Sequence, residues 1–333
     1  MSEYLEMTQQ EQIALVEEFA HDVLVQYGMK ARSIECVNHA YNTTFKIVAS
    51  DGKTYAMRVS TNFRKWPEHI WAESQWLREL AKGGVIKAPV PILNLQGEPY
   101  SNQYFFYQGS NLDVIVYPWL EGEVNDDKPT EGQLFALGQA MAKLHQLSKG
   151  WEPEGYANFL EVDRPLMVRR DNLFQFEQPL ISPEIYKLLF ELRDRSEKLF
   201  DFLKERFDRQ LIHADLHFGN ILWSDEGAMS VLDFDDAGIG SRLQDIAISL
   251  FYLREDREKE KHLLAGYASV APLPEYQPDE LELLITNRQL VLLNYLFETT
   301  TADDVALIPG YLEKTERRLK HYFETGEFSL LTE

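Results

Sequence analysis

The chain has 333 residues, 44% of them hydrophobic, which is enough to bury the core of one large domain or of two lobes. Its formal net charge of -21 argues against a nucleic-acid surface, because neutralising phosphates requires clustered Lys and Arg. No apolar run approaches the roughly 20 residues that cross a bilayer. The first residues also lack an export signal. We therefore expect a cytoplasmic protein without nucleic-acid or membrane partners.

Two helices are predicted in the first third of the chain. Thr8 and Glu11 form a capping box ahead of apolar residues with helical spacing, and this helix is expected to stop at Gly28. A second helical pattern covers residues 68–81.

Strands are predicted between and after these helices. Alternating residues at 45–49 and 54–59 flank Asp51-Gly52, and an Asp-Gly pair in this setting is a strong hairpin signal. Further strands are predicted at 104–107 and 112–117. Residues 1–117 are therefore expected to form a small antiparallel sheet with two helices.

From Pro118 onward the pattern is mainly helical. Thr130 precedes one helical stripe, and Ser182-Pro183 starts another. Later helices are predicted at 242–255, 279–297 and 310–323. The Gly-, Pro- and acid-containing segment 119–129 is the natural hinge between the two halves.

An acidic motif follows between Gln210 and Asp233, where the chain turns briefly to strand and loop. Residues 213–220 read His-Ala-Asp-Leu-His-Phe-Gly-Asn, and Asp233 lies thirteen positions after Asn220. Asp215, Asn220 and Asp233 have the order and spacing with which kinases hold magnesium-ATP beside a hydroxyl. Asp215 is expected to orient that hydroxyl and accept its proton, while Asn220 and Asp233 supply oxygens to Mg²⁺.

These motifs resemble the aminoglycoside phosphotransferase and choline kinase family, especially its bacterial phosphotransferase-type members. The resemblance is carried by HADLHFGNIL (213–222) and VLDFDDAGIGSRLQDIA (231–247), with weaker matches at YAMRV (55–59), AESQWL (72–77) and VYPWLEG (116–122). It implies an α+β, bilobal, protein-kinase-like fold. The small antiparallel-sheet N-lobe, 1–117, would bind the nucleotide, and the mainly helical C-lobe, 118–333, would carry the catalytic loop and the acceptor site.

The resemblance also implies a nucleotide site, from which this sequence departs in two places. Arg58 occupies the position of the usual strand lysine, and its pairing with Glu73 of the following helix is feasible. The loop 38–44 lacks glycine, so Asn42 would have to present polar groups to the phosphates. The alternative interpretations are that Arg58 is an exposed strand arginine and that the loop 38–44 is a tight polar hairpin with no ligand.

Four further residues near the acidic motif have expected supporting roles. By the resemblance, His213 braces backbone near the metal-binding hairpin rather than moving protons, and Asp245 fixes the catalytic loop from the start of a helix. Asp235 and Asp236 would either bind a second ion or hold their loop.

The predicted function is transfer of the γ-phosphate of ATP, with Mg²⁺, to the hydroxyl of a small molecule such as an amino alcohol, an aminoglycoside or homoserine. The acidic charge favours a cationic acceptor, whereas Val-Arg-Arg-Asp at 168–171 would suit a carboxylate. One alternative is a protein Ser/Thr kinase of the bacterial stress-response type. Another is a catalytically silent nucleotide-binding module, because the lysine and the loop glycines are missing. The oligomeric state is open.

Overall fold

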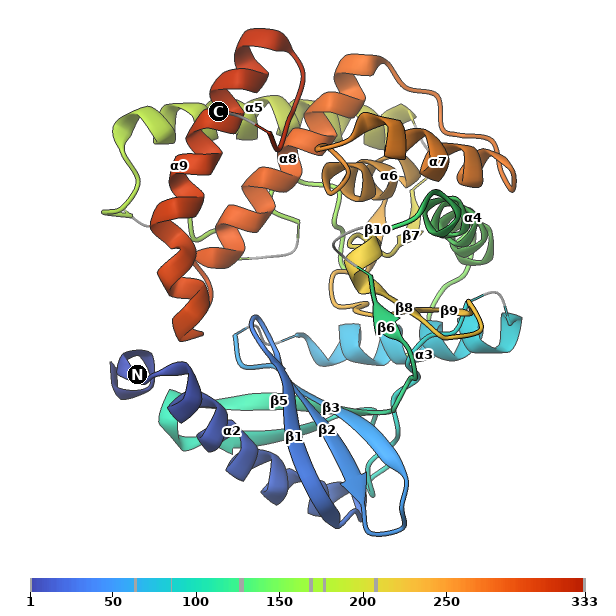
Figure 1. Cartoon of the computed structure of the whole chain (residues 1–333), viewed down its shortest axis with the longest axis vertical. Coiled ribbons are helices and arrows are strands. Elements are labelled where there is room, and N and C mark those ends of the chain that lie inside the picture. Colours follow the sequence, from blue (N-terminus) through green and yellow to red (C-terminus); the bar gives the residue numbers. More distant parts are fainter. Residues whose placement is uncertain are drawn as a thin grey trace.

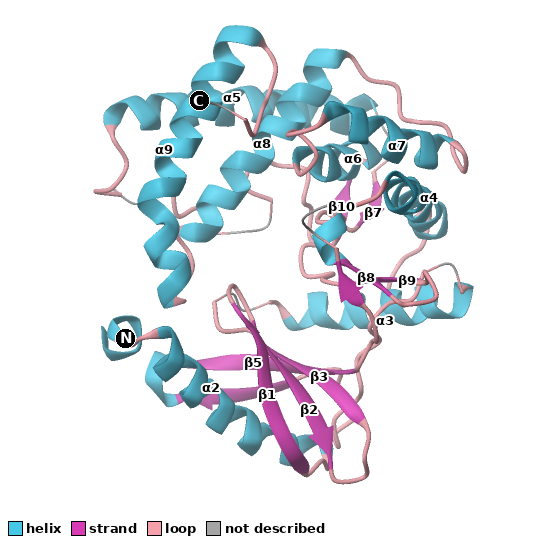
Figure 2. Ribbon diagram, viewed as in Figure 1, coloured by secondary structure: helices cyan, strands magenta, loops and turns pink. Residues whose placement is uncertain are grey.

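The computed structural model describes residues 2–62, 65–84, 86–125, 129–167, 170–175, 178–206 and 209–331. In this part of the chain, an N-terminal half built on an antiparallel sheet lies against a C-terminal half of helices (Figures 1 and 2). The predicted α+β, two-lobed arrangement is confirmed. The expected boundary between residues 117 and 118 stays a prediction.

The N-terminal sheet contains, among the described residues, five antiparallel strands in the order β1-β2-β3-β5-β4. Their bounds are β1 Ala31–His39, β2 Thr43–Ala49, β3 Thr54–Val59, β4 Ser101–Phe105 and β5 Ser110–Pro118. The predicted hairpin is β2–β3. The strand predicted at 104–107 ends earlier, at Phe105, because the chain then forms a short 3-10 segment, Phe106–Gln108. This segment ends at Gly109, which has a φ of 63°.

Three helices accompany this sheet: α1 Ser2–Glu6, α2 Gln9–Leu24 and α3 Pro67–Gly83. The capping box of Thr8 and Glu11 is present at α2, whose apolar side, including Val16, packs on Phe45 and Val114 of the sheet. The helix α3 lies between the sheet and the helical half (Figure 1). Ile70 packs on Ile115 and Tyr117 of the sheet, and other buried residues of α3 pack on the helical half.

The helical half contains α4 Glu131–Ser148, α5 Pro183–Arg206, α6 Arg242–Phe251, α7 Arg257–Ala268, α8 Pro278–Leu296 and α9 Ala302–Thr325. Two predictions were wrong in extent. The helix expected over 242–255 ends at Phe251, because Asp256 caps a separate helix, α7, that was not predicted. Helix α9 begins eight residues before the predicted start and contains Pro309 in its interior.

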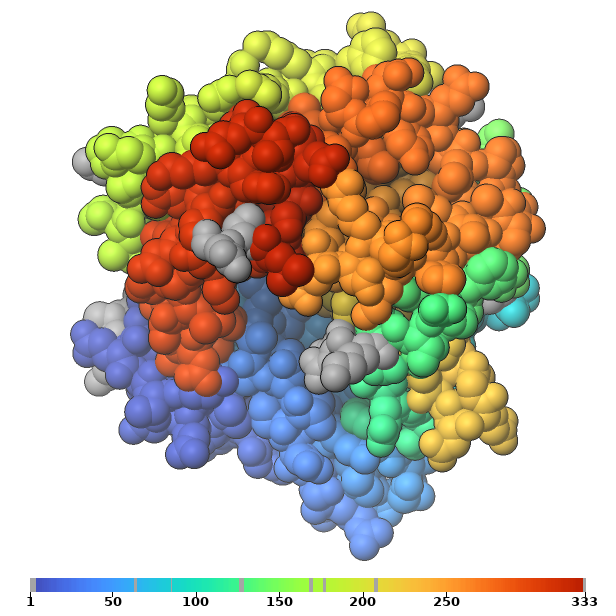
Figure 3. Space-filling view, turned by 45° about the horizontal axis from the view of Figure 1, so that its top comes forward, coloured from blue at the N-terminus to red at the C-terminus, as the bar shows by residue number. Residues whose placement is uncertain are grey.

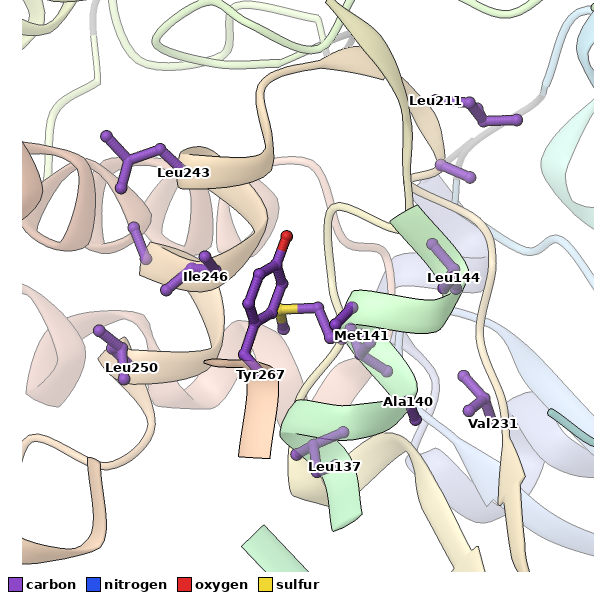
Figure 4. Close-up of a cluster of buried hydrophobic side chains, with 14 of the residues drawn as sticks. Leu137, Ala140, Met141, Leu144, Leu211, Val231, Leu243, Ile246, Leu250 and Tyr267 are labelled. Carbon is purple, nitrogen blue, oxygen red and sulfur yellow. The ribbon is translucent and has the colours of Figure 1, made fainter. Parts of the chain in front are cut away.

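Short strands carry the acidic motif at the base of the helical half. Strands β6 Glu123–Val124, β8 Ile221–Trp223 and β9 Met229–Val231 form one small sheet, and β7 Gln210–Ile212 pairs with β10 Gly238–Gly240. The core beside them joins α4, α6 and α7 to β7 and β9 through the side chains shown in Figure 4. None of the helices in the described ranges is long and apolar enough to span a membrane.

Helices α4 and α7 cross so closely that their contact requires glycine. A Cβ atom placed on Gly138 of α4 would lie 2.0 Å from the carbonyl oxygen of Leu263, and one on Gly266 of α7 would lie 2.0 Å from that of Phe135. Backbone oxygens cannot yield as a flexible side chain does, so a methyl group there would push the helices apart.

Gly138→Ala is therefore expected to lower the free energy of unfolding by about 2 to 3 kcal/mol, measured by urea denaturation. Gly132→Ala in the same helix is the matched control, because a Cβ atom placed there would have no other atom within 4 Å. That control should be neutral or stabilising by up to about 1 kcal/mol. Equal effects of the two substitutions would contradict the close crossing.

Candidate active site

The acidic motif forms a loop after β7 and a turn after β9, and both contain strained backbone. Ala214 and Asp233 have positive φ angles of 61° and 55°, which residues with a side chain rarely adopt. Such strain persists only where the surroundings hold it, and it concentrates at functional sites.

Buried hydrogen bonds hold the loop in this conformation. The carboxylate of Asp245, in the first turn of α6, accepts hydrogen bonds from the backbone N–H of His213 at 3.3 Å and of Ala214 at 2.8 Å. His145 of α4 contacts the same carboxylate at 2.9 Å. One ring nitrogen of His213 lies 3.0 Å from the carbonyl oxygen of Leu232, next to Asp233. The bracing contacts expected of His213 and Asp245 are confirmed.

Asp215 lies in this loop with 16% of its side chain exposed. Arg288 of α8 donates a hydrogen bond to its Oδ1, and the Nδ2 atom of Asn220 lies 3.3 Å from its Oδ2. Burial raises the pKa of Asp215; Arg288 opposes this shift, whereas the nearby Asp236 and Asp233 carboxylates add to it. The arrangement suits a group that accepts a proton near neutral pH.

Asn220 and Asp233 offer oxygens suited to a divalent cation. The Asn220 amide nitrogen donates to the backbone oxygen of Asp215 at 2.9 Å, which leaves its amide oxygen available to a ligand. Asp233 is exposed to the cleft, and its carboxylate accepts no hydrogen bond from another described residue. No group of three or more His, Cys, Asp or Glu in the described ranges is placed to hold a metal. Two protein oxygens still fit Mg²⁺, which takes most of its ligands from phosphates and water.

The cations opposite this motif are paired differently from the sequence prediction. Glu73 of α3 does not pair with Arg58; it accepts a hydrogen bond from Lys65, which precedes α3. Arg58 instead forms an ion pair with Asp235, whose carboxylate also lies 3.0 Å from Lys65 and accepts a hydrogen bond from Asn42 at 2.9 Å. The reason is positional, because Lys65 is buried eight residues before Glu73 and occupies its carboxylate.

One cleft of about 880 Å³ is lined by the carboxylates and amides described above as possible ligands and by Arg58, whereas Lys65 does not line it. Its lining includes Tyr117 near the end of β5, Trp119 and Leu120 after that strand, and Asp215 and Arg288 in the helical half. In the space-filling view the surface is hollowed between the sheet half, in blue, and the C-terminal helices, in orange and red (Figure 3). Each predicted site residue, Asp215, Arg58, Glu73, Asn42, Asn220 and Asp233, therefore lines a common cavity.

The loop that carries Asn42 is tied to the helical half across the mouth of this cleft. Asn62 donates a hydrogen bond to the carbonyl oxygen of Tyr41 at 2.7 Å and accepts one from the hydroxyl of Thr300 at 2.7 Å. Thr301 donates to the carbonyl oxygen of Ala40 at 2.6 Å. These hydrogen bonds join the N-terminal half to the α8–α9 turn.

Lys65, Arg288 and Asn62 are functional candidates that the sequence reasoning missed. Lys65 and Asn62 lie in an irregular segment without periodicity. Arg288 lies in the buried, otherwise apolar stripe of α8. An arginine at such a position is rarely buried without a partner, and this was the signal in the sequence that could have identified it. In the carboxylate-binding motif suggested at 168–171, residues 168 and 169 lie outside the described part of the chain.

Comparison with known proteins places this site in context. Residues 34–278 match the "Phosphotransferase enzyme family". Amicoumacin kinase of Bacillus subtilis (strain 168) is 26% identical over 243 residues, which are 71% of this chain and 67% of that protein. Stress response kinase A of Escherichia coli (strain K12) is 25% identical over 285 residues, 83% of this chain and 80% of that protein.

Solved structures share the fold over nearly the whole chain. A microcompartment-associated aminopropanol kinase superposes with a TM-score of 0.72 at 21% identity, covering 94% of this chain and 99% of that one. Amicoumacin kinase hAmiN, in complex with AMP-PNP, Ca²⁺ and Ami, gives a TM-score of 0.69 at 21% identity and covers 92% and 95% of the two chains. The protein-kinase-like fold is therefore confirmed.

Asp245→Ala is expected to lower the free energy of unfolding by about 3 kcal/mol, because it leaves two buried N–H groups and His145 without their acceptor. Calorimetry or urea denaturation measures the change. Asp279→Ala, in the exposed first turn of α8, is the control and should stay within about 0.5 kcal/mol of the unsubstituted chain. A similarly small loss for Asp245→Ala would contradict its bracing role.

Proposed function

The chain belongs to the phosphotransferase enzyme family, and we propose that it transfers the γ-phosphate of ATP to a hydroxyl of a small molecule in the cytoplasm. The observation that carries this proposal is the convergence of Asp215, Asn220 and Asp233 on one wall of the cleft. Arg58 and Asn42 line the same cleft from the sheet half. Phosphoryl transfer needs positioned oxygens and charge neutralisation more than covalent help from the protein, and this arrangement supplies both.

In the proposed reaction, Asp215 accepts a hydrogen bond from the acceptor hydroxyl and aligns its oxygen with the γ-phosphorus. The hydroxyl oxygen forms a bond to that phosphorus, while the bond from phosphorus to the β,γ-bridging oxygen breaks. The bond electrons leave with ADP, and the hydroxyl proton passes to the Asp215 carboxylate. Arg58 neutralises negative charge on the phosphates, and Asn42 contributes an amide. Lys65 compensates the charges of Glu73 and Asp235.

The residues present fit a divalent ion, which we propose to be Mg²⁺. The amide oxygen of Asn220 and the carboxylate of Asp233 would hold it. When bound, Mg²⁺ would neutralise charge on the nucleotide phosphates. Asp235 is a poorer candidate ligand, because its carboxylate is already engaged by Arg58, Lys65 and Asn42.

For the acceptor, we propose a small hydroxylated amine or amino acid. The relatives named amicoumacin kinase and aminopropanol kinase support a small molecule rather than a protein. The cleft of about 880 Å³ is consistent with an acceptor of this size, and Tyr41, Tyr252 and Tyr295 line it together with Asp215.

The experiment that tests this proposal measures ADP formation from ATP and Mg²⁺ with amino alcohols, aminoglycosides, homoserine and a Ser/Thr-rich protein as acceptors. We expect at least one small molecule to raise turnover above the acceptor-free rate and to gain a phosphate, seen by mass spectrometry. Transfer to the protein alone would favour the protein-kinase alternative. The protein would instead be a catalytically silent nucleotide-binding module if no acceptor raises turnover and Asp215→Ala binds nucleotide and behaves in the same way as the unsubstituted chain.

Asp215→Asn is expected to lower kcat by roughly 100- to 10,000-fold, because the amide cannot take the hydroxyl proton. ATP affinity, measured by calorimetry, should change little. Asp225→Asn, on the exposed β8–β9 turn, is the matched control and should keep the original kcat. The assignment fails if the two variants have equal activity.

Binding of Mg²⁺-ATP should weaken as the pH falls. Loss of hydration between the walls of the cleft, together with the neighbouring Asp235 carboxylate, raises the pKa of Asp233 to about 7, although Arg58 opposes the shift. A protonated Asp233 cannot bind a metal ion, so affinity should be full above pH 8 and fall toward tenfold per unit well below pH 7. Titration of the Mg²⁺-ATP affinity between pH 5.5 and pH 8.5, a range of roughly three units around that pKa, checks this. Asp233→Asn should bind weakly throughout, and a flat wild-type profile would contradict the prediction.

A further inference from the structure

A buried arginine, Arg288 in α8, is the described cation that directly contacts the carboxylate of Asp215. We propose that Arg288 is a positioning residue for phosphoryl transfer, which holds Asp215 in the orientation that receives the acceptor hydroxyl. This inference rests on the function proposed above and adds a residue that acts through Asp215.

The contacts fix the carboxylate at both of its oxygens. The Nη2 atom of Arg288 donates to Oδ1 of Asp215 and also lies 3.0 Å from the hydroxyl oxygen of Tyr252. Asn220 approaches Oδ2 from the other side at 3.3 Å. Each carboxylate oxygen has two acceptor positions, so a hydroxyl can still bind to Asp215 while its orientation is held.

The shape of the arginine head explains why this position is not a lysine. The Nη1 atom of Arg288 lies 3.9 Å from Oδ2 of Asp236, so one planar group bridges two carboxylates. Tyr295 fixes the second carboxylate by donating a hydrogen bond to Asp236 at 2.6 Å. The guanidinium carbon lies 5.8 Å and 5.9 Å from the ring centres of Tyr252 and Tyr295, which limits its movement.

The cost of this arrangement argues against a purely stabilising role. Only 2% of the Arg288 side chain is exposed, and its Nε and Nη1 atoms have no hydrogen-bond partner within the described ranges. Unsatisfied buried N–H groups are unfavourable, and a buried ion pair is weak support for stability. The ion pair of Arg288 and Asp215 is therefore explained by the fixed orientation that it gives to the Asp215 carboxylate.

The test measures kcat and KM for Arg288→Met and Arg288→Lys with the best acceptor and Mg²⁺-ATP. Arg288→Met should lower kcat about 100-fold, because a small misplacement of a catalytic group has an effect of this size. KM for ATP should stay within about twofold, since Arg288 contacts Asp215 and not the residues proposed to bind the phosphates. Arg288→Lys should recover part of the loss. Arg318→Met is the control, because Arg318 of α9 donates a hydrogen bond at 2.9 Å to Gln289, the neighbour of Arg288 in α8. This substitution should leave kcat unchanged.

A double-substitution cycle separates positioning through Asp215 from any other role. In an Asp215→Asn background, Arg288→Met should cause little further loss of kcat. A loss equal to that in the unsubstituted enzyme would overturn the inference, and so would an Arg288→Met enzyme with normal kcat.

If Arg288→Met does not fold, the variant Tyr252→Phe replaces it, because it removes one hydrogen bond of Arg288. Tyr252→Phe should lower kcat about fivefold. An unchanged kcat in this variant overturns the inference. If the unsubstituted enzyme transfers no phosphate to any acceptor, the proposed function fails and the role of Arg288 fails with it. An active wild type with unaffected variants refutes the role of Arg288 alone.

Discussion

The organisation of this protein depends on gathering carboxylates in one cleft and compensating their charge. The acidic groups there are Asp215, Asp233, Asp235, Asp236 and Glu73, and the described cations paired with them are Arg58, Lys65 and Arg288. Buried carboxylates repel one another and lose hydration, so each needs a cation, a hydrogen bond or a metal ion. Asp233 is without such a partner among the described residues, which is why it is the clearest metal-ligand candidate.

The fold serves this cluster from three directions. Strand β3 supplies Arg58, the segment before α3 supplies Lys65, and α8 supplies Arg288. Asp245 accepts a hydrogen bond from the backbone N–H of Ala214, whose φ angle is positive, and so holds the loop that carries Asp215 in a strained conformation. Across the mouth, the hydrogen bonds of Asn62 connect the loop of the sheet half to the α8–α9 turn. These hydrogen bonds hold the loop that carries Asn42 against the helical half.

Much of this was predictable from the sequence, because local signals carried it. The capping box at Thr8, the helix cap at Thr130 and the Asp-Gly turn depend on neighbouring residues, and each is present in the structure. The spacing of Asp215, Asn220 and Asp233 likewise reflects one loop and one hairpin. Resemblance to a family supplied the supporting roles of His213 and Asp245.

What the sequence did not predict arises from tertiary contacts. The exchange of partners between Arg58 and Lys65 depends on where an irregular segment meets α3, and no periodicity reports that position. Arg288 lies 73 positions after Asp215 in the chain, so only the packing of α8 brings them together. Helix α7 was missed because its many charged residues give a weak apolar stripe, although its glycine contact with α4 makes it part of the core.

The most direct measurement of the central claim is a crystal structure of the protein with Mg²⁺ and a non-hydrolysable ATP analogue. The account predicts a metal ion bound by the amide oxygen of Asn220 and the carboxylate of Asp233, with the terminal phosphate facing Asp215. A metal ion held by other residues, or phosphates that lie away from Arg58, would contradict it.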